Sequence, residues 1–357
     1  MRDRSYCARG ASPRRGFRGT DVITFGMRKT ATLLAVFMTA CTAARNAPPP
    51  MAFTIAVVPQ GATHEFWKSI HAGAIKAAQD LKASGVEVTL IWKAPLREDD
   101  REQQVQVVEG FLAQRISGIV LAPFDRRALV RPVEEAKRAG IPTVILDSGL
   151  DSDQVVSVLA SDNHRGGGLA AEHMAKLLGG KGKVLLLRYQ EGVASTEARE
   201  RGFVEKIKTF PGIELVSSDQ YAGGTRDTAK TAAENLLNRY GDQIQGLFTP
   251  NESSTAGALL ALEDLKKAGK IRFVGFDTSA AFITAMREGK LHGVVVQNPF
   301  RMGELGVRAM VDHLRGRPVS KSVDTGVQLI SPETLDAAES QVLLHPPLEK
   351  YLGSAVR

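Results

Sequence analysis

From Phe53 onward the sequence alternates short apolar runs with longer amphipathic runs, and this alternation limits the possible folds more than any other feature. The apolar runs are continuous and rich in β-branched residues, which is typical of strands buried on both faces of a parallel sheet. About ten strands are predicted, most of them followed by a helix, and this number favours an α/β fold of two doubly wound lobes over a single sheet. The predicted strands are Phe53–Val58, Val86–Trp92, Gly118–Ala122, Ile141–Leu146, Val155–Leu159, Lys183–Leu187, Ile213–Ser217, Gly246–Thr249, Ile271–Phe276 and Gly293–Gln297.

The net charge of +7 belongs entirely to the first fifty residues. They hold nine of the 46 Lys and Arg residues and two of the 39 Asp and Glu residues, so the rest of the chain has 37 of each sign. A nucleic-acid-binding face needs clustered excess positive charge in the folded part of a protein. We therefore expect no nucleic-acid partner.

Residues 1–50 have the features of an export leader. Met27 is the expected true start, because two basic residues and the apolar run Ala31–Ala40 follow it. That run is shorter than the ~20 residues needed to span a bilayer. The three residues before Cys41 form with it a sequence similar to a bacterial lipoprotein box, which makes Cys41 a candidate lipidation site and residues 42–50 a flexible tether. A cleaved signal with a chance cysteine is the alternative. Either interpretation predicts a protein of the periplasm or cell envelope.

Polar residues stand at the ends of four predicted strands, namely Asp147, Asn251, Asp277 and Gln297. In open parallel sheets, ligands bind beyond the carboxyl ends of the strands. Two lobes that face each other across such ends would enclose one polar cleft. Either Asp147 or Asp277, taken alone, is explained better as a helix N-cap than as a ligand contact. The four residues at equivalent strand ends together favour a ligand site.

Seven segments of the chain, in order, resemble the ribose-binding-protein group of type I periplasmic solute-binding proteins. The resemblance covers about Phe53–Val319 and implies two Rossmann-like lobes joined by a three-segment hinge. It places residues 51–161 and 298–330 in the N-terminal lobe, and 162–297 and 331–347 in the C-terminal lobe. The segments are IAVVPQGATHEFWKSIHAGAIKAA, IPTVILDS, VLASDNHRGGGLAAEHM, STEARERGF, TPNESSTAGALLAL, VGFDTS and GVVVQNPFRMGELGV.

The same resemblance implies the ligand-binding residues. The polar contacts would be Asp147, Arg199, Asn251, Asp277 and Gln297. Phe66 and Trp67 would be the aromatic pair, of which we expect one to face the ligand and the other the core. His64 falls where the group often has Asn. Two departures leave the identity of the sugar open: Ser148 replaces a frequent Arg, and Gly223-Gly224 stand near the place of an aromatic residue, which predicts a more open wall.

This set of side chains suits a polyol. Carboxylates accept hydrogen bonds, an arginine donates them, and amides do both, so a mixed ring can satisfy every hydroxyl group of a sugar. Flat aromatic rings can cover the apolar C–H faces of the sugar.

Other chemistry has weaker support in the sequence. Gly166–Gly168 lacks the spacing of a phosphate-binding loop and fits close helix packing better. The histidines show no metal-ligand spacing, and no nucleophile stands beside a base. We therefore expect neither an enzyme nor a cofactor or metal.

These observations predict a monomeric sugar-binding subunit that delivers its ligand to the permease of an ABC importer. Presentation of the closed form to a chemoreceptor or sensor kinase is the alternative. A regulator of the lac-repressor type would use the same fold, but it needs a helix-turn-helix headpiece where residues 1–50 have an apolar run and three prolines.

Overall fold

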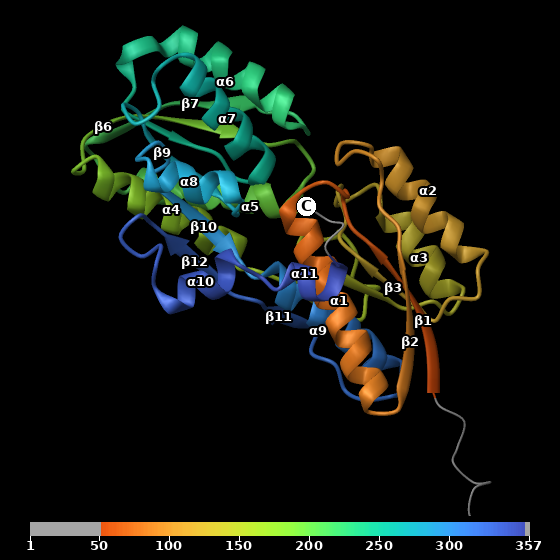
Figure 1. The fold of residues 1–357 in the computed structure, drawn as a ribbon. Coiled ribbons are helices and arrows are strands. Elements are labelled where there is room, and N and C mark those ends of the chain that lie inside the picture. The colour runs from red at the N-terminus through yellow and green to blue at the C-terminus, as the bar shows by residue number, and fades with distance from the viewer. Residues whose placement is uncertain (1–50, 354–357) are drawn as a thin grey trace, which may run out of the picture. The chain divides into compact units, whose positions relative to one another are not determined.

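The computed structural model describes residues 51–353, which form two α/β lobes, each built on a six-stranded sheet (Figure 1). Both lobes belong to one compact unit of the chain. The predicted leader and tether, with Met27 and Cys41, lie outside the described residues. Within the described residues, no helix has both the length and the apolar composition needed to cross a bilayer.

The first lobe has the strand order β11-β5-β4-β3-β1-β2, and all of its strand pairs are parallel. Four helices, α1, α2, α3 and α9, flank this sheet. The strands are β1 (Met51–Val58), β2 (Val86–Trp92), β3 (Gly118–Leu121), β4 (Thr143–Leu146), β5 (Val158–Ala160) and β11 (Ser322–Asp324). The helices are α1 (Glu65–Ala83), α2 (Arg101–Leu112), α3 (Val130–Arg138) and α9 (Pro299–Leu314).

The second lobe has the strand order β12-β10-β9-β8-β6-β7, so the strand order corresponds position by position to that of the first lobe. Its one antiparallel pair joins β12 to β10. The strands are β6 (Gly182–Arg188), β7 (Ile213–Tyr221), β8 (Gly246–Phe248), β9 (Arg272–Phe276), β10 (Gly293–Gln297) and β12 (Val327–Ile330). The helices are α4 (Asn163–Leu177), α5 (Ala194–Ile207), α6 (Arg226–Tyr240), η1 (Gly241–Gln243), α7 (Glu252–Asp264), α8 (Ala280–Arg287) and α10 (Ala338–Leu344).

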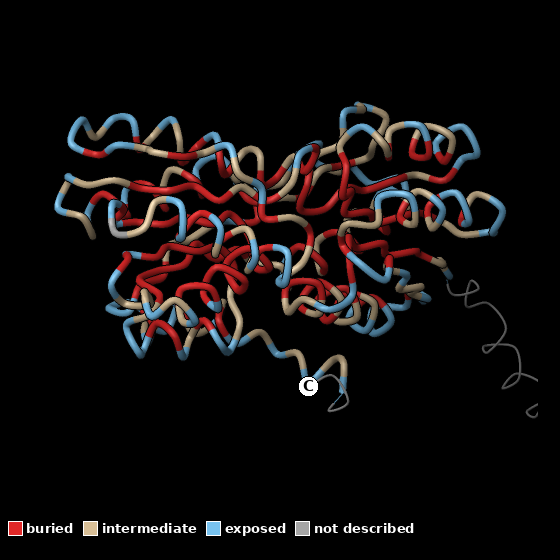
Figure 2. Tube along the Cα trace, turned by 90° about the horizontal axis from the view of Figure 1, so that it is seen from above, coloured by how far each residue is buried: buried red, intermediate tan, exposed pale blue. Residues whose placement is uncertain are grey.

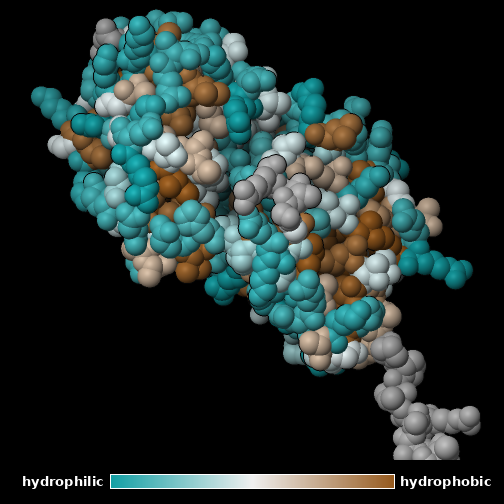
Figure 3. Space-filling model, in the orientation of Figure 1, coloured by the Kyte–Doolittle hydropathy of each residue, from teal (hydrophilic) through white to brown (hydrophobic). Residues whose placement is uncertain are grey.

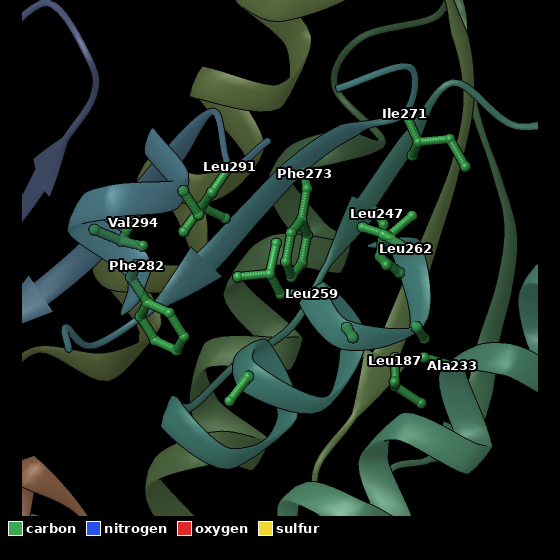
Figure 4. Packing of buried hydrophobic residues seen from close by; sticks show 14 of the residues in the cluster. Leu187, Ala233, Leu247, Leu259, Leu262, Ile271, Phe273, Phe282, Leu291 and Val294 are labelled. Carbon is green, nitrogen blue, oxygen red and sulfur yellow. The ribbon is translucent and has the colours of Figure 1, made fainter. Parts of the chain in front are cut away.

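Successive residues of each central strand pack into opposite helix layers. In β1, Ile55 and Val57 join the cluster of α1 and α9, whereas Ala56 and Val58 join the cluster of α2 and α3. Figure 4 shows one such layer in the second lobe, where Phe273 of β9 packs among leucines of β8 and α7. Buried segments accordingly run through the interior of both lobes, with exposed residues at the outer faces (Figure 2). This pattern confirms the predicted doubly wound fold and the ten predicted strands.

Glycines bring pairs of helices into very close contact. A Cβ added at Gly73 of α1 would lie 1.9 Å from the carbonyl oxygen of Phe300 in α9, and one at Gly167 of α4 would lie 1.8 Å from that of Arg199 in α5. Only glycine permits such an approach, so close packing explains Gly167, as the sequence analysis favoured for the Gly166–Gly168 run.

The chain crosses between the lobes after β5, after β10 and again near β11, and this third crossing differs from the prediction. The boundary was expected after residue 330, but β12 pairs with β10 in the second sheet, so the chain crosses between β11 and β12. Pairing with an existing sheet satisfies backbone groups that a short isolated strand cannot, and the sequence of β12 alone does not show which sheet it joins.

A C-terminal segment, not predicted from the sequence, makes a fourth passage between the lobes. Helix α10 packs into the core of the second lobe through Leu344, and helix α11 (Leu348–Leu352) lies against α1 of the first lobe (Figure 1). The ring of Tyr351 stands 5.6 Å from that of Phe300. Residues 345–352 therefore form a C-terminal strap across the two lobes.

On the face shown in Figure 3, hydrophobic side chains form separate patches among hydrophilic ones. This distribution is ordinary for a water-exposed protein surface.

Candidate ligand-binding site

One cavity, with an empty volume of about 340 Å³, brings together all eight residues that the sequence analysis selected. Its walls come from both lobes, and most of them follow the carboxyl ends of strands, as expected for open parallel sheets. The predicted residues on its wall are His64, Phe66, Trp67, Asp147, Arg199, Asn251, Asp277 and Gln297. Seven further residues line the cavity that were not predicted from the sequence, namely Gln60, Glu98, Tyr189, Val193, Ser195, Thr196 and Glu252.

Asp147 and Asp277 occupy equivalent places in the two lobes, directly after β4 and β9. Both adopt a left-handed backbone conformation, with φ of 60° and 66°, which is uncommon for residues other than glycine. Neither is a helix N-cap, because Asp162 caps α4 and Ser279 caps α8. The N-cap interpretation is therefore wrong for both, and the strained backbone at two matching positions is typical of functional sites.

Arg199 of α5 lies between these two aspartates. Its guanidinium nitrogens stand 3.7 Å from Asp147 Oδ1 and 3.9 Å from Asp277 Oδ2. Nε donates to Asn163 Oδ1 at 2.7 Å, and Nη1 donates to the Pro250 carbonyl at 2.9 Å. The side chain is buried, so Arg199 is not a solvated helix residue.

Asp277 is held by donors from its own lobe. Gln297 Nε2 donates to Oδ1 at 2.8 Å, and the Glu252 backbone N–H donates to Oδ2 at 3.1 Å. Burial raises the pKa of Asp277, although Arg199 and Gln297 oppose this. Asn251 lies one residue before Glu252, where its side chain caps α7 and so fixes the start of that helix.

Asp147 has fewer partners. Burial raises the pKa of its carboxyl group to about 7; Arg199 opposes the rise, whereas the charges of Asp277 and Glu98 add to it. Its Oδ1 accepts no hydrogen bond from the described residues.

Phe66 and Trp67 both line the cavity and both belong to the core of the first lobe. Their rings meet edge to face with centroids 4.9 Å apart. The expectation that one would face the cleft and the other the core is therefore wrong, because the two adjacent residues at the start of α1 share one wall.

Glu98, in the loop after β2, is the main residue that the sequence analysis missed. Its carboxylate contacts His64 Nδ1 at 2.7 Å and accepts hydrogen bonds from Trp67 Nε1 and from the hydroxyl of Tyr189, the latter at 3.1 Å. Burial alone lowers the pKa of His64, but the charge and hydrogen bond of Glu98 outweigh it and raise the pKa to about 9. The available signal was the position of the loop at the carboxyl edge of the sheet, where ligands bind.

Glu252 joins the lobes at the other side of the cavity. The backbone N–H of Phe66, in the first turn of α1, donates to its Oε2 at 3.3 Å. Burial raises the pKa of Glu252 to about 7, with His64 opposing and Asp277 and Glu98 adding to the rise.

Several contacts close the lobes over the cavity. Tyr189 reaches Glu98 across the lobes, and the Ser195 backbone N–H donates to Ser148 Oγ at 3.2 Å. Gly224 is buried, and a Cβ added there would lie 2.4 Å from Cβ of Asp99 in the first lobe. The more open wall expected at Gly223-Gly224 is therefore absent from this closed structure, because the missing side chain lets the other lobe approach.

No group of three or more His, Cys, Asp or Glu residues among positions 51–353 is arranged to hold a metal ion.

A family model described as a periplasmic binding protein domain matches residues 55–318. The chain belongs to the periplasmic binding protein family. This periplasmic binding protein is 30% identical over 282 residues to the ribose import binding protein of Bacillus subtilis, covering 78% of this chain and 87% of that protein. It is 31% identical to the D-allose-binding periplasmic protein of Escherichia coli, covering 72% and 83% of the two chains.

Solved structures give the same result. A carbohydrate transporter solute-binding protein from Agrobacterium radiobacter, in complex with D-arabinose, is 30% identical with a TM-score of 0.77. A solute-binding protein from Agrobacterium vitis with bound D-fucose is 31% identical, also with a TM-score of 0.77. The matches cover 82% of this chain, and 99% and 100% of the respective solved chains. Membership of this family of periplasmic binding proteins confirms the predicted family and the prediction of a binding protein rather than an enzyme.

Proposed function

We propose that this periplasmic binding protein captures a monosaccharide in the cavity between its lobes and delivers it to the permease of an ABC importer. The observation that carries the proposal is the meeting of two aspartates, an arginine and an amide beside an aromatic pair at the strand ends of both lobes. The names of its relatives support the ligand class, since they describe proteins for ribose and allose and complexes with D-arabinose and D-fucose.

The polar groups of the cavity complement hydroxyl groups. Asp147 and Asp277 accept, Arg199 donates, and Gln297 offers an amide oxygen that accepts no hydrogen bond from the described residues. Phe66 and Trp67 supply an apolar face for the C–H surface of a sugar ring.

Closure would couple ligand capture to delivery. The contacts of Tyr189 with Glu98 and of Phe66 with Glu252 join different lobes, so they form only when the lobes meet. A ligand that contacts both lobes shifts the population towards the closed form, and the closed form is what a permease distinguishes from the empty protein.

We also propose that the protein is a monomer and that it is attached to a membrane. The pattern around Cys41 supports attachment of the monomeric protein to the outer side of the cytoplasmic membrane through a lipid on that cysteine. Metabolic labelling with a fatty-acid analogue tests this, because Cys41→Ser should lose the label.

Calorimetry with the purified chain tests the ligand class. The panel contains aldopentoses, aldohexoses, 6-deoxyhexoses and linear polyols. We expect at least one monosaccharide to bind, and the double variant Arg199→Met, Asp277→Asn to lose that binding while it remains folded. Glu65→Gln, a change at a partly exposed residue of α1 outside the cavity wall, is the matched control. Absence of binding across the whole panel would overturn the proposed function.

A further inference from the structure

The cavity contains more buried negative charge than positive charge. Four carboxylates line it, at Glu98, Asp147, Glu252 and Asp277, whereas the only cationic groups on its wall are Arg199 and His64. His64 is 2.7 Å from Glu98, so these two groups offset each other. Arg199 is then the remaining cation on the wall, and it lies near two of the other three carboxylates, Asp147 and Asp277.

Arg199 cannot compensate all of this charge. It stands 3.7 Å from Asp147 and 3.9 Å from Asp277, beyond hydrogen-bonding distance of either. Two of its N–H groups are already used by Asn163 and the Pro250 carbonyl. A buried carboxylate without a cation or hydrogen bonds is costly, so the site needs positive charge or protons from outside the protein.

The hydrogen-bonding groups of the cavity show the same deficit. Of its lining residues, the buried side-chain atoms without a hydrogen-bond partner among the described residues are Asp147 Oδ1 and Gln297 Oε1. Both atoms are acceptors, and their side chains are buried, with only 5% and 2% of the residue surface exposed. The cavity therefore lacks donors and positive charge, whereas a hydroxyl group supplies one donor and no charge.

We propose that the ligand is an aminated sugar or aminated polyol, whose protonated amine binds at Asp147. This inference rests on the proposed function and specifies its ligand class. An ammonium group offers three donors, no acceptor and one positive charge, which matches a carboxylate oxygen that accepts no hydrogen bond from the described residues. Its remaining hydroxyl groups meet Asp277, Asn251 and Gln297 as in the proposed sugar site.

The titration of the site agrees with this geometry. Burial raises the pKa of both Asp147 and Glu252 to about 7, so protons hold part of the charge in the ligand-free cavity near neutral pH. The groups that face Asp147 are Arg199, which lowers its pKa, and Asp277 and Glu98, which raise it. An ammonium at Asp147 displaces its proton, whereas Glu252 can keep its own.

Calorimetry of the full chain with matched ligand pairs tests the inference. The cyclic pairs are D-glucosamine with D-glucose and D-galactosamine with D-galactose, and the linear pair is 1-amino-1-deoxy-D-glucitol with D-glucitol. We expect the amine of at least one pair to bind about tenfold tighter than its hydroxyl partner, because a charged hydrogen bond contributes about twice as much as a neutral one. The cyclic and linear pairs distinguish an amino sugar from an aminopolyol.

The variant Asp147→Asn separates charge from shape. It should remove the preference for the amine, so that the two members of a pair bind about equally well, because the amide carries no charge. Titration of the tight binder in buffers of different ionisation enthalpy should show release of protons on binding.

The outcomes test the aminated ligand separately from the proposed sugar-binding function. If neutral sugars bind and no amine binds tighter than its partner, the inference fails and the proposed function stands. If Asp147→Asn keeps the preference for the amine, its place at Asp147 is refuted. If neither the pairs nor the wider sugar panel bind, the proposed function itself fails.

Discussion

Replacing Glu98 by Gln tests whether this carboxylate holds a charged histidine in the first lobe. Glu98, His64 and Trp67 all belong to that lobe, so their contacts do not depend on closure. The glutamine keeps the shape of the side chain, and its oxygen still accepts from Trp67. It removes the negative charge that raises the pKa of His64.

The expected effect depends on pH with a defined sign. The pKa of His64 is about 9 in the folded protein and has an ordinary value of 6.5 in an unfolded chain, a difference equivalent to about 3 kcal/mol. Because the folded state binds the proton more tightly, this stabilisation is complete below about pH 6.5 and is lost as the pH rises through about 9. In Glu98→Gln, burial keeps His64 neutral over this range, so the contribution is absent.

Urea unfolding of the ligand-free protein at about pH 6 and about pH 9 measures the effect. We expect Glu98→Gln to lower the free energy of unfolding by about 3 kcal/mol at the lower pH and by much less at the higher pH. Glu65→Gln, which removes a partly exposed carboxylate of α1 paired with Lys68, should keep the wild-type pH dependence. An equal loss of stability at both pH values would show that Glu98 does not hold a charge on His64.

Three further predictions concern binding, packing and opening. Arg199→Ala and Asp277→Ala should each weaken sugar binding by ~2–4 kcal/mol, measured by calorimetry, and normal binding by both would show that the site is misplaced. Gly167→Ala should destabilise the protein by about 1–3 kcal/mol in urea unfolding, because its Cβ would meet a backbone carbonyl at 1.8 Å, whereas Gly168→Ala, with nothing within 4 Å, should stabilise it slightly; equal effects would contradict the packing argument. Deletion of residues 345–353 should speed ligand release several-fold in stopped-flow experiments, since one of four links between the lobes is lost, and an unchanged rate would show that the strap does not restrain opening.

The central strands could be predicted from the sequence because they are buried on both faces. Such strands are continuous apolar runs, as in Gly118–Leu121, and the pattern survives whatever the neighbouring elements are. Short edge strands carry no such pattern. β11 (Ser322–Asp324) and β12 (Val327–Ile330) are defined by the partner strands that they meet, which the local sequence does not encode.

The residues of the candidate site could be predicted where they stand at strand ends. Asp147, Asn251, Asp277 and Gln297 follow this rule, and the structure places them on one cavity. Glu98 lies six residues beyond Trp92, the last residue of β2, and no local pattern indicates that it faces His64 and Tyr189. Its burial results from contacts between segments far apart in the chain, which only the tertiary fold brings together.

The matching strand orders of the two lobes make the cavity comparable to the interface of a dimer whose subunits have been fused into one chain. Each half contributes one aspartate on a left-handed backbone, at Asp147 and at Asp277, so neither half holds a complete recognition surface. The distance between these two aspartates is then set by the segments that connect the halves. Relatives with identical ligand-contacting residues but different crossing segments should hold the two aspartates at different distances and select ligands of different length. In such a protein, changes in the segments that connect the lobes can alter specificity, as can changes in the ligand-contacting residues.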